Sequence, residues 1–199
     1  MTGVQALERI AATQPMRSGR PERREFEYKR HGTLSPIVNF DIVSGQVFAP
    51  SIGPTRTEVD FAAHIAGTID TDPDAMWVFV TDQLNTHQSE SLVRLVAQRC
   101  GVVDDLGVKG ETGILGSLTS RAAFLSDPAH RIQFVYVPKH TSWLNQVEIW
   151  FSILVRRVIK RGNFTSVDDL RQRILDFIAY FNQTAKPFRW TYTGRPLVG

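Results

Sequence analysis

The sequence contains a single cysteine, Cys100, among 199 residues. One cysteine excludes an internal disulfide framework and a thiolate zinc site, and it fits a reducing compartment. The sequence also lacks a basic-then-apolar signal pattern at its start, and no apolar run approaches the length of a membrane span. We therefore expect a cytoplasmic protein with no membrane partner.

An excess of one charge sign is also missing. The 23 Lys and Arg residues nearly balance the 20 Asp and Glu residues, so the net charge of +3 does not by itself indicate a polyanionic partner. The basic residues are nevertheless clustered. One cluster lies between Arg17 and Arg30, and the other comprises Arg156, Arg157, Lys160, Arg161, Arg171 and Arg173. A solvated face is the simpler interpretation of each cluster, and phosphate contact gains weight only if both border a catalytic site.

The length and the 42% hydrophobic content suit one compact domain. Periodicity and turn signals predict these elements: a strand at Gly3 to Leu7, a hairpin over Ser35 to Ile42 and Gln46 to Ala49, helices over Thr57 to Thr68 and from Gln88 or Ser89 to Arg99, a short helix over Leu118 to Leu125, strands at Met76 to Thr81 and Ile132 to Val137, and helices over Trp143 to Lys160 and after Thr165 or Ser166. The apolar run ending at Thr81 is typical of a strand buried on both faces. This order predicts an α/β fold, with a mixed sheet flanked by helices.

Two acidic residues occupy positions that metal-dependent phosphodiester chemistry requires, one at the end of a strand and one on a helix. Asp82 follows the apolar strand, and Glu148 lies near the start of a long amphipathic helix. Carboxylate oxygens select hard cations such as Mg²⁺ or Mn²⁺, and two such ions about 4 Å apart can clamp a phosphodiester. Spacing alone is a weak signal, because Asp often ends a strand at a turn and Glu early in a helix favours the helix dipole.

Two longer motifs strengthen this hypothesis. The run Val80-Thr81-Asp82-Gln83-Leu84-Asn85-Thr86-His87 resembles the second catalytic block of DDE-superfamily transposases, in the insertion-sequence group related to mariner elements. The run from Pro138 to Phe151, which includes Ser142-Trp143-Leu144-Asn145 and Glu148-Ile149-Trp150-Phe151, resembles their third block. The segments 161–170 and 186–191 are also similar to that group, so the resemblance covers nearly the whole chain.

The resemblance implies a single domain over residues 1–199 with an RNase H-like fold, a mixed five-stranded sheet with helices on both faces. It implies a metal-dependent transposase that cleaves and rejoins DNA, with Asp82 and Glu148 as catalytic residues and as ligands of Mg²⁺ or Mn²⁺ in a two-ion site. The expected partner is double-stranded DNA, at transposon ends and target, rather than a small-molecule substrate. A homodimer is left open.

One departure from the family pattern matters. The family's first catalytic Asp lies on the opening strand, just before a segment like Gln5-Ala6-Leu7-Glu8-Arg9, and no acidic residue precedes Glu8 in this sequence. Asp41 is a poor substitute, because it lies at the predicted hairpin turn. The helix-turn-helix region expected ahead of this domain is also absent. We therefore expect an N-terminally truncated domain with an incomplete metal site and negligible activity. The alternative is a non-catalytic DNA-binding or dimerisation remnant.

Neighbouring residues have weaker assignments. Asn85, His87, Ser142 and Asn145 are candidates to support the carboxylates from a second layer, although helix capping is the simpler role for Asn85, Ser142 and Asn145. Trp143, Trp150 and Phe151 are expected to pack in the core rather than to stack on bases. The candidate DNA-binding residues follow or precede Glu148 along the chain. They are Lys139, His140, Arg156, Arg157, Lys160 and Arg161.

Overall fold

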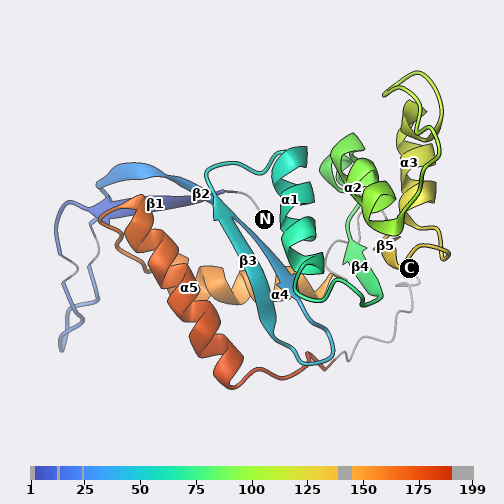
Figure 1. The fold of residues 1–199 in the computed structure, drawn as a ribbon. Coiled ribbons are helices and arrows are strands. Elements are labelled where there is room, and N and C mark those ends of the chain that lie inside the picture. Colours follow the sequence, from blue (N-terminus) through green and yellow to red (C-terminus); the bar gives the residue numbers. More distant parts are fainter. Residues whose placement is uncertain (1–2, 13, 24, 139–144, 190–199) are drawn as a thin grey trace, which may run out of the picture.

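The structure, a computed structural model, describes residues 3–12, 14–23, 25–138 and 145–189 (Figure 1). Its strands are β1 (Val4–Arg9), β2 (Tyr28–Phe40), β3 (Val47–Gly53), β4 (Trp77–Thr81) and β5 (Ile132–Tyr136). Its α-helices are α1 (Glu58–Ile69), α2 (Glu90–Cys100), α3 (Leu118–Leu125), α4 (Gln146–Leu154) and α5 (Val167–Gln183). Shorter turns are η1 (Asn85–Gln88), η2 (Ile114–Gly116) and the π-helical η4 (Val155–Ile159), which continues α4. None of the described helices combines the length and the apolarity that a membrane crossing needs.

The five described strands form two sheets instead of the single five-stranded sheet that we expected. The antiparallel sheet has the order β1-β2-β3, and the parallel sheet pairs β4 with β5. Within the described parts of the chain, β4 pairs with β5 and β1 with β2, and no ladder joins the two sheets. The mixed α/β class is confirmed, but the continuous sheet is not seen among the described residues.

Strand β2 is long enough to serve two partners in succession. Its first half pairs with β1 as far as Leu34, which lies opposite Val4. Its second half, Ser35 to Phe40, pairs with β3 on the other edge. The predicted hairpin is therefore confirmed, but β2 starts earlier than the sequence indicated.

The hydrophobic core is divided in the same way as the sheets. Helices α4 and α5 pack on the antiparallel sheet, with Trp150, Leu154 and Leu170 fully buried there. Helices α1, α2 and α3 enclose β4 and β5 around a second cluster that includes Phe134 and Leu92. Burial of Trp150 and Phe151 confirms their expected core role.

Strand β4 differs from its prediction. Its side chains alternate, so that Val78 is 58% exposed and Val80 is 44% exposed. Trp77 and Phe79 stack on the opposite face, next to Phe134. The expectation of burial on both faces is wrong because α4 and α5 cover the antiparallel sheet and leave this face of β4 open.

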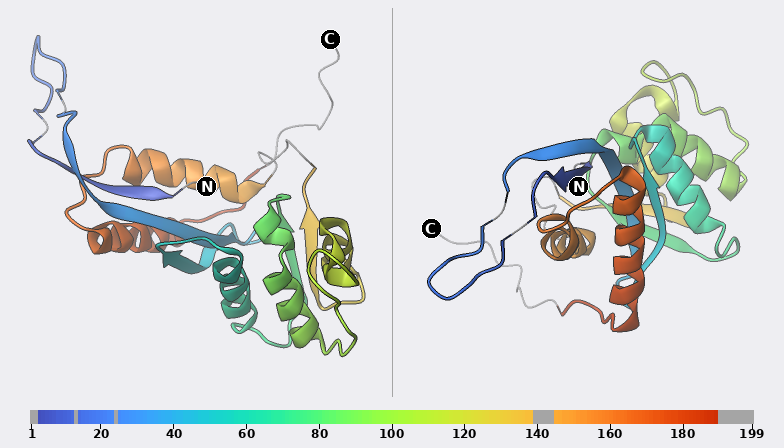
Figure 2. Two further views of the ribbon diagram at one scale, coloured as in Figure 1. Left: turned by 90° about the horizontal axis from the view of Figure 1, so that it is seen from above. Right: turned by 90° about the vertical axis from the view of Figure 1, so that its left-hand side faces the viewer.

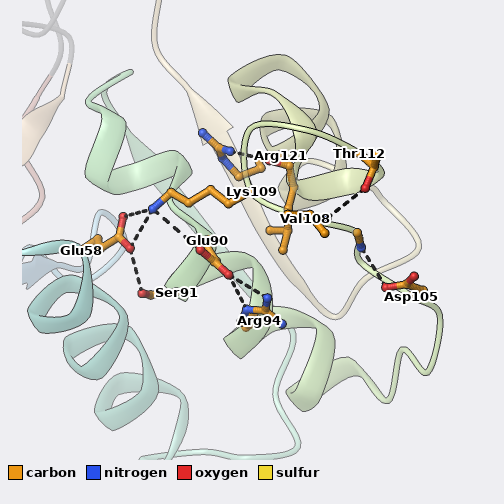
Figure 3. A network of polar contacts seen from close by, with 11 residues as sticks. Glu58, Glu90, Ser91, Arg94, Asp105, Val108, Lys109, Thr112 and Arg121 are labelled. Atoms are coloured by element: carbon orange, nitrogen blue, oxygen red, sulfur yellow. Dashed lines mark hydrogen bonds and ion pairs between the residues drawn. The ribbon is translucent and has the colours of Figure 1, made fainter.

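Ion pairs and hydrogen bonds made by charged side chains hold the glycine-rich segment between α2 and α3 (Figure 3). Lys109 Nζ lies 3.2 Å from a carboxylate oxygen of Glu58 on α1 and 3.8 Å from one of Glu90 on α2. Arg121 on α3 donates to the main-chain carbonyls of Gln88 and Leu115. These contacts tie three helices together beside β4 and β5.

A narrow arm connects β1 to β2 and projects from the body of the molecule (Figure 2). Isolated bridges hold its two sides together, Gln14 opposite Arg23 and Arg17 opposite Arg20. Its base is tied to the segment after η4, where the main-chain N–H of Arg9 donates to Asn163 Oδ1 at 2.6 Å.

Candidate active site

A groove of about 1030 Å³ separates the two sheets. Its walls are the second half of β2, strand β4 and the start of α4. Asp82 reaches it from the segment after β4, and Glu148 from the first turn of α4. Two carboxylates that are 66 positions apart in sequence therefore border one cavity.

Asp82 is held by the histidine five positions later. Nδ1 of His87 lies 2.7 Å from Oδ1 of Asp82, and the main-chain N–H of Leu84 donates to the same oxygen at 3.2 Å. The hydrogen bond from His87 lowers the pKa of the Asp82 carboxyl, against the opposing effect of burial. Oδ1 is thus engaged and the group is ionised at neutral pH, while Oδ2 makes no hydrogen bond within the described part of the chain.

The position of His87 is itself fixed. Its ring packs 4.3 Å from the ring of Phe61, and its main-chain carbonyl accepts a hydrogen bond from the hydroxyl of Tyr136 on β5. The imidazole therefore orients the Asp82 carboxylate, as a residue behind a metal ligand does.

Glu148 is half-buried near the N-terminus of α4. The side chain of Asn145 caps this helix by accepting from the main-chain N–H of Val147, which confirms the capping role expected for Asn145. The unpaired N–H groups of a helix start favour a carboxylate there. The first turn of α4 therefore places Glu148 at the groove.

Other predicted residues are placed as follows. Asn85 lines the groove at the start of η1, but the side chain that caps α2 is Ser89, so the capping role expected for Asn85 is wrong. Asp41 also lines the groove, and its carboxylate accepts from Val43 and Ser44 in the hairpin turn. Lys139, His140, Ser142 and Trp143 lie outside the described residues.

The donor set suits a hard cation only in part. Carboxylate oxygens are the correct ligands for Mg²⁺ or Mn²⁺. Among the residues that the structure describes, however, no group of three or more acidic, histidine or cysteine side chains is arranged to hold an ion. Asp82 and Glu148 are the described residues that could contribute carboxylate ligands. The carboxylate of Asp41 is already hydrogen-bonded within its own turn.

The residues of the two basic clusters do not line the groove. Arg156, Arg157, Lys160 and Arg161 are exposed on η4 and just beyond it, and none of them lines the groove. Lys160 is twelve positions after Glu148, a separation of about 18 Å along a helix. The projecting arm is at the same end of the molecule as η4 (Figure 2). The arm and η4 thus lie at one end of the molecule, and neither lines the groove.

Comparison with protein families decides the identity. A sequence model described as DDE superfamily endonuclease matches residues 2–171. The chain belongs to this family. Comparisons with curated proteins and with solved structures gave no match. DDE superfamily endonucleases act on DNA and generally use divalent metal ions.

Sequence reasoning missed three residues of the groove wall. His64, Thr81 and Gln146 line it, and each has a buried polar side-chain atom without a hydrogen-bond partner among the described residues. His64 is 3% exposed, and burial lowers its pKa to about 4. Its Nδ1 lies 2.9 Å from Ser51 Oγ, which leaves Nε2 as the unpartnered atom. Thr81 and Gln146 lie within the two motifs quoted above, whereas no local signal marks His64, whose place in the wall depends on the packing of α1.

Proposed function

We propose that this DDE endonuclease domain acts at the groove, where Asp82 and Glu148 together hold a divalent cation, Mg²⁺ or Mn²⁺, against a DNA phosphodiester. The reaction class is the strand cleavage and transfer of transposition. The observation that carries the proposal is the convergence of these two carboxylates on one cavity in a chain of this family.

The residues of the site and of η4 have different roles in the proposed reaction. His87 keeps Asp82 ionised and holds one of its carboxylate oxygens. The start of α4, capped by Asn145, presents Glu148 at the groove. A divalent cation bound there supplies Lewis-acid stabilisation of the charge that develops on the phosphate oxygens. The basic end of η4 lies about 18 Å away along the helix, roughly five base-pair steps, where it can neutralise phosphates further along the same duplex.

The small number of carboxylate ligands limits both the affinity of the site for metal and the rate of DNA cleavage. Two carboxylates give a divalent cation less charge and fewer oxygens than a closed site, so we propose weak metal binding and negligible cleavage by this chain. The absence of a third acidic ligand among the described residues also supports a second candidate function, a domain that binds DNA or a partner subunit without cutting.

Metal-centred cleavage tests the proposed site without relying on nuclease activity. Fe²⁺ replaces Mg²⁺ in carboxylate sites, and with ascorbate it generates radicals that cut the nearest backbone. We expect protein fragments that end near residues 82 and 148. Asp82→Asn and Glu148→Gln should abolish both sets of fragments, whereas Glu111→Gln, at an exposed acid away from the groove, should not. Fragments at other positions, or fragments unaffected by the two substitutions, would contradict the site.

A further inference from the structure

The end of η4 and the middle of α5 form a shallow depression of about 310 Å³. Three arginines line it, together with one carboxylate. They are Arg157 on η4, Arg161 just after η4, Arg173 on α5 and the carboxylate of Asp176. None of the four lines the groove, and we call the depression the arginine pocket. Arg157 and Arg161 form no ion pair with any residue that the structure describes, so two cations without a counterion lie beside a third.

The backbone places Arg157 and Arg161 on one side of η4. Residues four apart on a helix are neighbours, and like charges at that spacing repel. The segment is π-helical, with the main-chain N–H of Lys160 bonded to the carbonyl of Val155 at 2.8 Å, and such turns are frequent at functional sites. Arg156 and Lys160 have the same spacing but do not line the pocket. The pocket therefore separates one basic pair of η4 from the other, although all four residues are exposed.

Arg173 is held in place from two sides. Its Nε donates to Oδ1 of Asp169 at 2.9 Å, and its guanidinium lies 5.6 Å from the centre of the Phe164 ring. That ring is 1% exposed, and a side chain at Gly162 would collide with it, so the glycine leaves room for the ring against which Arg173 stacks. A cation that is already oriented loses less side-chain freedom when a ligand binds.

The charges of the pocket indicate which anion it suits. Guanidinium groups match the oxygens of phosphates and carboxylates with paired N–H donors. Asp176 lines the same pocket, and its carboxylate accepts a hydrogen bond from Gln172 at 2.8 Å. The carboxylates of Asp176 and Asp169, set against the three guanidinium groups, leave one net positive charge. This balance favours a DNA phosphodiester, with its single negative charge, over a phosphate monoester, which carries about −1.5 to −2 at pH 7.

We propose that the arginine pocket binds one backbone phosphate of DNA through Arg157, Arg161 and Arg173. The inference deepens the proposed function, because it rests on DNA binding beside η4, but it needs neither a metal ion nor the carboxylates of the groove. It assigns a DNA contact to α5. It also excludes Arg156 and Lys160 from contact with this phosphate.

Removal of equal charge from the two sides of η4 tests the pocket. The probe is a DNA duplex of mixed sequence, bound to the full chain in EDTA and followed by fluorescence anisotropy at several KCl concentrations. Arg157→Gln with Arg161→Gln should weaken binding at least tenfold and lower the slope of log K against log salt by about 0.9, the value for one phosphate. Arg156→Gln with Lys160→Gln should change binding less than threefold. Equal losses overturn the pocket but leave DNA binding by η4 standing, whereas no loss in either double variant overturns both.

Two single substitutions on α5 test the pocket with its η4 arginines intact. Arg173→Gln should weaken binding at least threefold, whereas Arg94→Gln should not, although Arg94 is similarly exposed and also pairs with an acid four positions earlier. Asp176→Asn should strengthen binding at least twofold, because it removes a carboxylate that repels phosphate. Asp168→Asn, on the same helix but outside the pocket, should not. A gain in binding cannot come from unfolding, and unchanged binding in both Arg173→Gln and Asp176→Asn contradicts the site.

Chemical protection identifies the source of the phosphate. Phenylglyoxal modifies accessible arginines, and mass spectrometry locates the modified positions. The duplex should slow modification of Arg157, Arg161 and Arg173 at least fivefold and leave Arg156 unprotected. Inorganic phosphate at the same phosphate concentration should protect none of them. Equal protection of Arg156 by the duplex, or equal protection of the pocket by inorganic phosphate, overturns the assignment to a DNA backbone phosphate.

Discussion

Nδ1 of His87 lies 2.7 Å from Oδ1 of Asp82, and this contact couples the residue after β4 to the turn that begins the next helical segment. The contact fixes one carboxylate oxygen of a residue that lines the groove. It also keeps the group ionised, since the His87 hydrogen bond is the main cause of the lowered pKa of Asp82.

Removal of the imidazole should raise the pKa of Asp82. We expect His87→Ala to move the pKa toward the ordinary carboxyl value of about 4, because the largest stabilisation of the charged form is removed. Carboxyl ¹³C NMR titration measures it. His31→Ala is the control, because its imidazole pairs with Glu8 on β1 and does not line the groove. A titration unchanged by His87→Ala would show that the contact does not control the charge.

The same contact gives a pH dependence to the free energy of unfolding. A carboxyl whose folded pKa is lowered stabilises the fold above its unfolded pKa, and that stabilisation is lost as pH falls through the folded value. The loss should therefore occur below about pH 4. His87→Ala should remove this part of the acid sensitivity, as measured by urea denaturation at pH 3 and pH 5.

His64 should make the free energy of unfolding depend on pH in a higher range than Asp82 does. Its pKa falls from 6.5 to about 4 on burial, so the unfolded state binds more protons between these values and stability declines as pH drops from 6.5. Between pH 7.5 and pH 5 the decline from this residue is about 2 kcal/mol. Urea denaturation of His64→Gln should lack this decline. An identical pH slope in both proteins would mean that the histidine is not buried as a neutral group.

Trp150 should be among the most sensitive core positions. It is fully buried and contacts the rings of Phe151, Phe177 and Phe181. We expect Trp150→Ala to lower the free energy of unfolding by about 3–5 kcal/mol. Trp150→Phe should cost less, because it keeps most of the ring packing and removes an indole N–H that has no partner among the described residues. Guanidinium unfolding of both variants checks the order, and equal losses would contradict it.

The exposed charges of η4 should control the salt dependence of DNA retention. Replacement of Arg156, Arg157, Lys160 and Arg161 by glutamine should weaken binding. It should also flatten the dependence of log K on log salt by about 0.9 for each DNA phosphate that the protein no longer neutralises. The matched double variants are Arg156→Gln with Arg157→Gln, and Arg94→Gln with Lys109→Gln in the ion-paired network of Figure 3. If the two double variants show the same dependence of log K on log salt, η4 does not bind DNA.

The sequence predicted local structure well where the signal was local. Ser166 caps α5, Thr57 caps α1 and α3 spans Leu118 to Leu125, because capping side chains and helical periodicity act within one turn. Asp82 and Glu148 both line the groove, and the catalytic role that the two motifs imply for them stays a prediction. Metal binding at that cavity stays a prediction.

The sequence pattern could not predict which strands pair when they are far apart along the chain. The apolar run of β4 could not show that one face stays open, because that depends on which sheet α4 and α5 cover. The division into two sheets depends on where the β1 ladder stops on β2, which is a property of register. The unpartnered atoms of His64 and Gln146 likewise arise only when separate elements meet.

The most direct test of the account is a Mn²⁺ titration followed by isothermal calorimetry and by the electron paramagnetic resonance signal of free Mn²⁺. We predict one weak binding event in the unmodified chain that disappears in Asp82→Asn and equally in Glu148→Gln, and that persists in Glu111→Gln. Binding that survives either groove substitution, or the absence of any binding by the unmodified chain, would contradict a cation shared by these two carboxylates.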